Sequence, residues 1–277
     1  MDAPEFLAVG HLAKDLLEQG YRLGGTVAYS AVTAHRLGRR AAMLTSCGPD
    51  VELGDLPSEI QTHVLLSEAS TTFRNVYQSG QRVQFLYSRA RPIAIQAVPA
   101  AWRKTPVVHL GPIAREFDEE MIEHFAANLL GLTAQGWLRR WDDRARIQPS
   151  GWEPVPELLP QIDALIVSEE DLQGEAAALR ELFPLARLAV ETQGERGATL
   201  YHQGRVEHHP APQVEVVDLT GAGDVFAAAF LIRLWETGDP WQSLPFAVAT
   251  ASLSVTGPGL AGVPDRARVE ELLAKGW

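Results

Sequence analysis

Short apolar runs alternate with longer amphipathic runs along most of the chain. The short runs have the length of buried strands, and the long runs have helical spacing. This pattern predicts strands at 6–9, 41–45, 107–110, 162–167, 188–191 and 214–217, and helices at 26–37, 117–130, 169–182, 223–235, 241–255 and 266–274. Strands alternating with helices of this length predict an α/β fold with a mostly parallel sheet and helices on both faces.

Two segments depart from this rhythm. Residues 72–77 and 82–87 alternate apolar with polar positions around Gln78-Ser79-Gly80, which is typical of a β-hairpin. A second hairpin is predicted where 198–201 and 206–208 flank Gln203-Gly204. The polar side chains of the first hairpin, among them Arg82 and Gln84, face either solvent or a ligand.

The composition narrows the class of partner. A formal net charge of −11 argues against nucleic acid or an acidic membrane surface as the main partner. Cys47 is the only cysteine, so no intrachain disulfide can form. The N-terminus has no basic segment followed by an apolar one, and no apolar run approaches the ~20 residues of a membrane span. We expect a cytoplasmic protein of one domain, residues 1–277, that acts on a small molecule.

A glycine-rich turn, Gly221-Ala222-Gly223-Asp224, stands between a predicted strand and a predicted helix. Free backbone N–H groups and the positive end of the helix dipole meet at such a turn, and glycine lets an anion approach the backbone. Asp224 could accept a proton from a hydroxyl that attacks a phosphate, as a general base. It could equally be a helix cap in a tight turn. The motif alone does not decide whether Asp224 is a general base or a helix cap.

Other phosphate-binding patterns are absent from the sequence or misplaced in it. No G-x-x-x-x-G-K-[ST] occurs, which excludes a P-loop. The run from Gly257 to Gly262 matches G-x-G-x-x-G formally, but it follows a predicted helix rather than a strand and contains a proline. A dinucleotide site is therefore not expected there.

The run from Asp218 to Phe226 resembles the C-terminal signature of the ribokinase-like (PfkB) carbohydrate kinases. Further matches follow in the family's order, and they cover nearly the whole chain: Val9-Gly10 with Asp15, Gly24-Gly25 with Arg36-Leu37-Gly38, Thr192-x-Gly194-x-x-Gly197, and Pro258-Gly259. The resemblance implies a ribokinase-like fold with a small β lid, whose elements we expect around 11–24 and 71–92.

The resemblance also implies the chemistry of the site. Asp224 would be the catalytic base, and Gly221, Ala222 and Gly223 would form the anion hole for the transferred phosphate. ATP and Mg²⁺ would be required. The residues expected to bind the nucleotide are Ser168, Thr192, Gly194, Gly197, Thr220, Gly223, Pro258 and Gly259. Those expected to bind the acceptor are Asp15, Gly24, Gly25, Tyr29, Arg82, Gln84 and Arg139.

Two positions depart from the family pattern. Tyr29 stands where the family usually has an asparagine that helps to hold sugar hydroxyls, which puts a ribose or fructose pocket in doubt. The family's N-x-x-E motif appears as Ser168-Glu169-Glu170-Asp171, in which Asp171 could still hold hydrated Mg²⁺. Asp218 is the residue expected to contact a monovalent cation, K⁺, if the enzyme uses one.

The sequence leaves the acceptor open. The segments 111–116 and 135–139, with the Ser168 variant, resemble a subgroup similar to myo-inositol kinases. A sugar or cyclic polyol is therefore expected, with a nucleoside kinase or a non-catalytic ligand sensor of the same fold as alternatives. Trp137, Trp141 and Trp152 fit core packing, and an apolar interface in a homodimer would also account for them.

Overall fold

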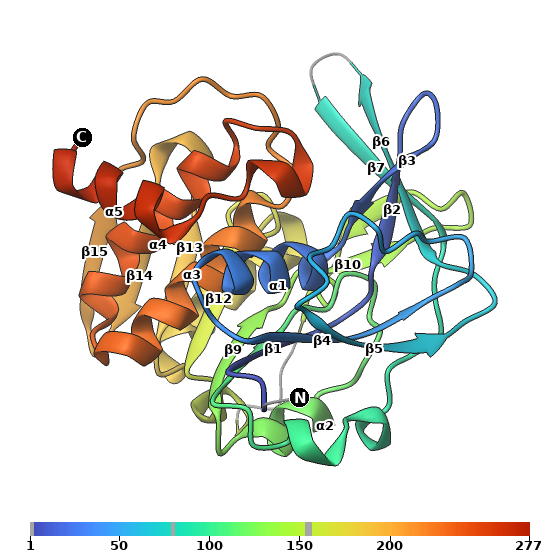
Figure 1. The fold of residues 1–277 in the computed structure, drawn as a ribbon, viewed down its shortest axis with the longest axis horizontal. Helices are drawn as coiled ribbons and strands as arrows, with labels where there is room; N and C mark the ends of the chain where they lie inside the picture. The colour runs from blue at the N-terminus through green and yellow to red at the C-terminus, as the bar shows by residue number, and fades with distance from the viewer. Residues whose placement is uncertain (1–2, 79–80, 153–156) are drawn as a thin grey trace.

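The protein is described by a computed structural model that covers residues 3–78, 81–152 and 157–277; of side chains 77–82 nothing is described. A large sheet runs through the molecule in the order β15-β14-β13-β12-β9-β8-β1-β4-β5 (Figure 1). Its strands are β1 (Phe6–Val9), β4 (Ala41–Cys47), β5 (Gln61–Leu66), β8 (Val107–Leu110), β9 (Leu129–Thr133), β12 (Ala164–Ser168), β13 (Ala189–Thr192), β14 (Ala198–His202) and β15 (Arg205–His209). In this order the seven strands β13, β12, β9, β8, β1, β4 and β5 pair in parallel, whereas β14 and β15 pair antiparallel at one edge.

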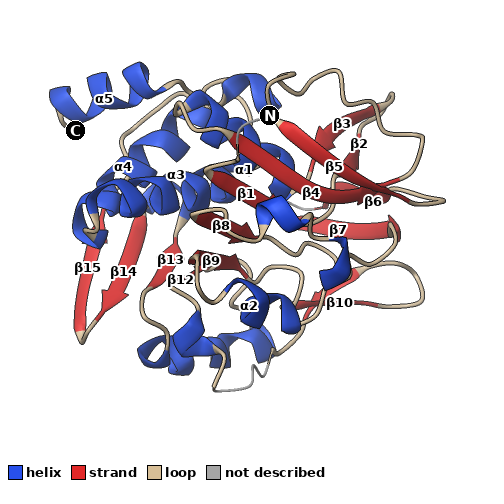
Figure 2. Cartoon of the chain, turned by 60° about the horizontal axis from the view of Figure 1, so that its bottom comes forward, coloured by secondary structure: helices blue, strands red, loops and turns tan. Residues whose placement is uncertain are grey.

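Helices cover both faces of this sheet, as Figure 2 shows. The helices are α1 (Thr26–Arg36), α2 (Glu120–Phe125), α3 (Ala222–Thr237), α4 (Pro240–Ser254) and α5 (Arg266–Lys275). Short 3₁₀ segments are η1 (Ile95–Ala97), η2 (Ala100–Trp102), η3 (Leu159–Gln161), η4 (Gly174–Leu185), η5 (Gly194–Arg196) and η6 (Gly259–Gly262). One core cluster joins α1, α3 and α4 to the sheet, and a second joins α2 and η4 to its other face. In β1, Phe6 and Ala8 enter the first cluster, and Leu7 and Val9 the second.

A second sheet stands beside the large one. Its four strands are ordered β3-β2-β6-β7, with bounds β2 (Ala13–Leu16), β3 (Tyr21–Gly24), β6 (Thr71–Gln78) and β7 (Gln81–Ser88). Figure 1 shows them projecting together from one side of the large sheet. The segments predicted as lid elements lie in this sheet, which we call the lid sheet. A short hairpin, β10 (Arg139–Trp141) and β11 (Ile147–Pro149), completes the strands described.

The predicted fold class is confirmed, but several elements differ from the pattern. The helix predicted at 117–130 ends at Phe125, because Leu129 and Leu130 pair with β8 as part of β9. The helix predicted at 169–182 is the 3₁₀ segment η4, which contains Pro184. The strand predicted at 214–217 is a loop, in which the Val217 N–H donates to the Val255 carbonyl.

The indole rings considered for an interface are partly accounted for by packing within the chain. Trp137 is 7% exposed and lies with its ring centre 5.9 Å from that of Phe117 and 5.0 Å from that of Trp152. Its indole N–H donates to the Phe117 carbonyl. Trp137 is therefore a core residue. Within the described residues, no helix is long and apolar enough to cross a membrane.

Candidate active site

The candidate site lies where the parallel strands of the large sheet end. The carboxyl ends of β1, β8, β9 and β12 fall at one edge of the sheet, because the register pairs Val9 with Leu110 and Leu110 with Leu132. Helices α1 and α3 begin near this edge and pack against each other. In open α/β sheets a ligand typically binds in the crevice outside the carboxyl ends of the strands.

Asp224 lies in the first turn of α3. Its Oδ1 accepts a hydrogen bond of 2.7 Å from the hydroxyl of Thr26, the first residue of α1. Burial raises the pKa of Asp224 to about 6, and the negative charges of Asp171 and Asp15 act in the same direction. The Thr26 hydrogen bond and the positive charge of Arg139 oppose that rise. Asp224 is therefore a carboxylate whose pKa is close to neutral pH.

The two glycines that precede Asp224 have different roles. Gly221 has φ 78° and caps α3; a Cβ there would lie 2.3 Å from the Tyr29 ring. Gly223 is exposed, and a Cβ there would meet no atom within 4 Å. Gly221 is thus required by packing, and Gly223 leaves open space over the free N–H groups of the helix. That space is suited to an anion.

Asp218 fixes the start of this turn. Its Oδ1 accepts from the N–H and the hydroxyl of Thr220 at 3.0 and 2.7 Å, and its Oδ2 from the Gly259 N–H at 2.9 Å. The guanidinium of Arg22 forms an ion pair with Oδ2. Burial would raise the pKa of Asp218, but these hydrogen bonds and the arginine charge outweigh it and hold that pKa below its usual value.

Arg139 and Asp171 are brought together beside Asp224. Their side chains form an ion pair of 3.2 Å, and they are only 12% and 13% exposed. The Gln135 side chain also donates to Asp171, at 3.2 Å. Both charges act on the pKa of Asp224, in opposite directions. The two residues, which the sequence assigned to acceptor and metal, therefore belong to one site.

The lid sheet contributes Asp15 and Arg22, which are paired across β2 and β3. A Cβ at Gly24 would lie 2.4 Å from Asp15 Oδ2, so that glycine makes room for the carboxylate. Gly25, with φ 93°, caps α1, and a Cβ there would lie 2.3 Å from the His11 carbonyl oxygen. The pair of glycines therefore lets the lid sheet lie close to the start of α1.

The residues predicted to bind the nucleotide line the neighbouring strand ends. Ser168 ends β12 and Thr192 ends β13, and the two are paired in register. Gly194 and Gly197 flank the 3₁₀ turn after β13; a Cβ at Gly197 would lie 2.0 Å from the His209 carbonyl oxygen. Pro258 and Gly259 form the start of η6, beside Asp218.

Tyr29, Gln84 and Arg82, which were predicted to contact the acceptor, differ in where they lie. Tyr29 is 1% exposed and lies beneath Gly221, so its ring supports the turn and is not an open wall of an acceptor pocket. Gln84 is paired with Asn75 within the β6–β7 hairpin. The side chain of Arg82 lies outside the described residues. No group of three His, Cys, Asp or Glu residues that could hold a metal occurs among the residues described.

Three further residues of the site were not predicted from the sequence. Thr26 holds Asp224, and Arg22 holds Asp218. Glu116 is fully buried and accepts N–H bonds from His11, Ile113 and Ala114, which ties the turns after β1 and β8 together. Arg22 pairs with Asp15 across β2 and β3, but these two four-residue strands show no clear pattern that would have indicated it. Thr26 and Glu116 give no signal without the fold.

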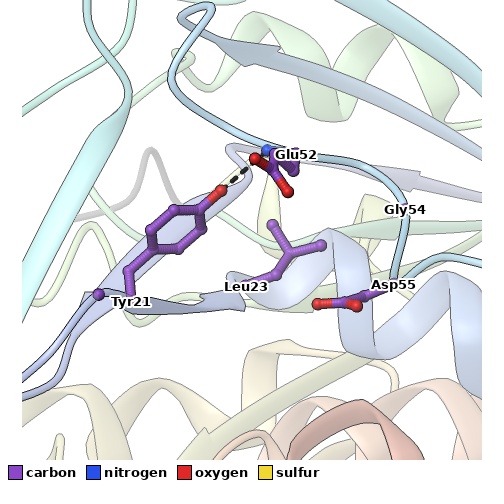
Figure 3. Close-up of a pocket in the computed structure, with 6 residues that line it drawn as sticks. Tyr21, Leu23, Glu52, Gly54 and Asp55 are labelled. Carbon is purple, nitrogen blue, oxygen red and sulfur yellow. Dashed lines mark hydrogen bonds between the residues drawn. The ribbon is translucent and has the colours of Figure 1, made fainter.

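A separate hollow of about 270 Å³ lies beside the β2–β3 hairpin, and Figure 3 shows residues that line it. It is lined by Tyr21, Leu23, Glu52 and Asp55, and the Tyr21 hydroxyl accepts the Glu52 N–H at 2.9 Å. Tyr21 and Leu23 alternate with Arg22 along β3, so they point away from the face that carries Arg22. The hollow is distinct from the site around Asp224.

Comparison with known proteins gives consistent results. The model of the pfkB family of carbohydrate kinases matches residues 141–266. The 2-dehydro-3-deoxygalactonokinase of Haloferax volcanii is 29% identical over 92% of this chain and 89% of its own length. A pyrophosphate-dependent kinase in the ribokinase family, solved with a pyrophosphate analog and myo-inositol, superposes with a TM-score of 0.79 at 22% identity, over 96% of this chain and 99% of that one.

Ribokinase of Arabidopsis thaliana, solved with ribose and ATP, superposes with a TM-score of 0.71 at 21% identity, over 98% of this chain and 99% of that one. These solved structures share the fold over almost the whole chain. The family model covers the segment that carries Asp171, Asp218 and Asp224. Residues 141–266 are similar to the pfkB family of carbohydrate kinases, a relative that matches along most of the chain is a kinase, and the chain has the ribokinase fold.

Proposed function

We propose that this kinase transfers the γ-phosphoryl group of ATP to a hydroxyl of a small sugar or cyclic polyol, with Asp224 as the general base. The observation that carries the proposal is the position of Asp224, held by Thr26 next to the open N-terminus of α3. A base and an anion site in one turn are what phosphoryl transfer to a hydroxyl requires.

The reaction follows from that geometry. The acceptor oxygen attacks the γ-phosphorus while its proton passes to the Asp224 carboxylate, and the bond to the β-phosphate oxygen breaks to release ADP. The carboxylate of Asp15, on the lid sheet, accepts hydrogen bonds from hydroxyls of the acceptor and so orients it. Gly24 leaves room for the Asp15 carboxylate, and Gly25 lets the backbone at His11 lie close to the start of α1. A pKa of about 6 leaves Asp224 mostly ionised at pH 7, yet basic enough to take the proton.

Positive charge at the site comes from two sources. The N–H groups around Ala222 and Gly223 offer hydrogen bonds to the transferred phosphate where charge develops. Arg139 adds a guanidinium at the same end of the sheet, held in place by Asp171. On the donor side, Ser168, Thr192 and the turns at 194–197 and 258–259 border the nucleotide.

Mg²⁺ would be held by the donor phosphates and, through water, by Asp171. The donor set fits this role, because Mg²⁺ keeps several waters and needs only one or two carboxylates beside phosphates. Asp171 receives two described hydrogen bonds, from Gln135 and Arg139, so its ionised carboxylate keeps acceptor capacity. When bound, the ion neutralises charge on the β- and γ-phosphate oxygens.

Pyrophosphate is a second candidate donor. The pyrophosphate-dependent kinase superposes with a TM-score of 0.79, against 0.71 for the ribokinase solved with ATP. Both donors present a terminal phosphate to the same anion hole, so the site around Asp224 serves either. They differ in whether the turns at 194–197 and 258–259 have an adenine to contact.

The test is a matrix of donors and acceptors. ATP and pyrophosphate are each combined with pentoses, hexoses, inositols, 2-dehydro-3-deoxy sugar acids and nucleosides, and release of ADP or phosphate is measured. We expect turnover with ATP and at least one sugar or polyol. Turnover with pyrophosphate alone would show that pyrophosphate, and not ATP, is the donor. Turnover with nucleosides alone would show that a nucleoside, and not a sugar or polyol, is the acceptor. Binding without turnover for every pair would identify a ligand sensor.

A further inference from the structure

The carboxylate of Asp218 has hydrogen-bond donors on both oxygens. Oδ1 receives the N–H and the hydroxyl of Thr220, and Oδ2 receives the Gly259 N–H and the Arg22 guanidinium. An ionised carboxylate offers about four acceptor positions. The four described donors therefore use its capacity, and one of them carries a full positive charge.

Arg22 reaches Asp218 from the lid sheet across Gly259. A Cβ on Gly259 would lie 3.2 Å from Cδ and 3.6 Å from Nε of Arg22, so a larger residue at 259 would crowd the arginine. Gly259 also has φ 48°, a backbone conformation that favours glycine. The side chains of Arg22 and Asp218 are 36% and 12% exposed, so the pair is shielded mainly on the Asp218 side.

This arrangement does not fit a monovalent cation at Asp218. Potassium needs free oxygen lone pairs, whereas N–H and hydroxyl donors occupy the positions around this carboxylate. A cation there would also meet the charge of Arg22. The sequence-based expectation of K⁺ at Asp218 therefore disagrees with the donors that the structure places around it.

We propose that Arg22 is a positioning residue that supplies, from within the chain, the positive charge beside the anion-hole turn, so that turnover is independent of monovalent cations. The inference rests on the proposed function, because the turn it supports is the one that carries Asp224. The ion pair also links the lid sheet to that turn: β3 bears Arg22, and α3 begins four residues after Asp218.

The structure indicates what would happen without the guanidinium. The Tyr29 hydroxyl is buried and has no hydrogen-bond partner among the described residues. It lies 3.7 Å from the Cβ position of Gly259, whose N–H donates to Asp218 Oδ2. Removing the arginine side chain would leave two oxygens, one anionic, near the same glycine, and both are candidate ligands for K⁺ in the Arg22→Ala variant.

The experiment compares the wild type with Arg22→Ala and Arg22→Lys in tetramethylammonium buffer, while KCl replaces the tetramethylammonium salt at constant ionic strength. For the wild type we expect a flat rate. For Arg22→Ala we expect roughly tenfold slower turnover, largely restored by about 100 mM K⁺. Arg22→Lys keeps the charge and should remain independent of K⁺. Arg187→Ala, which removes another arginine paired with an aspartate, is the matched control.

Thermal unfolding in the same buffers gives a readout that does not need turnover. Potassium should raise the melting temperature of Arg22→Ala by on the order of 2 °C and leave the wild type unchanged. If no donor and acceptor pair reacts, the proposed function fails while this measurement still tests Arg22. Stimulation of the wild type by K⁺ would overturn the inference. So would a defect of Arg22→Ala that neither potassium nor lysine repairs, which would indicate a packing role.

Discussion

The turn at 218–224 and the lid sheet face the same site but are held by different means. The turn is fixed mainly through its own backbone. Two backbone N–H groups donate to the Asp218 carboxylate, Gly221 caps α3, and the Tyr29 ring packs beneath Gly221. The lid sheet faces the site through side chains, chiefly those of Asp15 and Arg22. In the proposed reaction the base and the anion hole therefore lie on the core, and the charges proposed to meet the acceptor lie on the lid sheet.

The largest expected effect is on the core side of this comparison. Asp224→Asn keeps the shape of the side chain but removes the base, and we expect kcat to fall by roughly 10²–10⁴. Donor affinity should stay nearly unchanged, because the N–H groups of α3 remain. Steady-state kinetics and calorimetric titration with the donor check both points. A variant with near-normal turnover would contradict the base assignment.

The corresponding change on the lid should affect binding of the acceptor. Asp15→Asn weakens charge-assisted hydrogen bonds to acceptor hydroxyls, so KM for the acceptor should rise about 10–100-fold with KM for the donor unchanged. Asp55→Asn, in the hollow beside the β2–β3 hairpin, is the matched control. Equal effects on both substrates would show that the lid does not serve the acceptor alone.

The two glycines of the turn separate packing from binding. Gly221→Ala meets the Tyr29 ring and a left-handed φ, so it should lower the free energy of unfolding by roughly 2–4 kcal/mol. Gly223→Ala meets no atom, so stability should change by less than about 0.5 kcal/mol. Its methyl group would instead obstruct the phosphate and raise KM for the donor roughly tenfold. Denaturant unfolding and kinetics distinguish the two; normal donor binding by Gly223→Ala would rule out an anion at that position.

The smallest effect concerns the link between α1 and α3. Thr26→Val removes the hydroxyl that stabilises ionised Asp224, so the pKa of Asp224 should rise. The rate should then fall by about twofold to tenfold at pH 6 and remain nearly unchanged at pH 8. A uniform loss at both pH values would indicate a change of shape at the start of α1 instead.

Local pattern predicted most of the core. The runs that became β1, β4, β8 and β12 are apolar and bounded by turns, and the helices from 222, 240 and 266 have clear periodicity. Local pattern did not indicate the lid strands β2 and β3, because their four-residue segments include Lys14, Asp15 and Arg22; only the family resemblance led us to expect lid elements around 11–24. Val216 and Val217 indicated a strand by composition, but both are more than half exposed in a loop.

The candidate site, like the fold, was predicted only in part from the sequence. The order of the motifs indicated Asp224 and its glycines, because a long signature stands at a helix start. It could not indicate that Thr26 holds Asp224 from 198 positions away, or that Arg22 meets Asp218 from 196 positions away. Such contacts depend on how α1, α3 and the lid sheet pack. Tyr29 was assigned to the acceptor for its place in a signature, whereas burial beneath Gly221 makes it a support of the turn.

The dependence of kcat/KM on pH, measured for the wild type and for Asp224→Asn, tests the central claim most directly. Protonated Asp224 cannot accept a proton, so the wild-type value should rise about tenfold per pH unit up to an inflection near 6 and level off above it. The residual activity of Asp224→Asn should lack that inflection. An inflection near 6 that persists in the variant would mean that another group is the base.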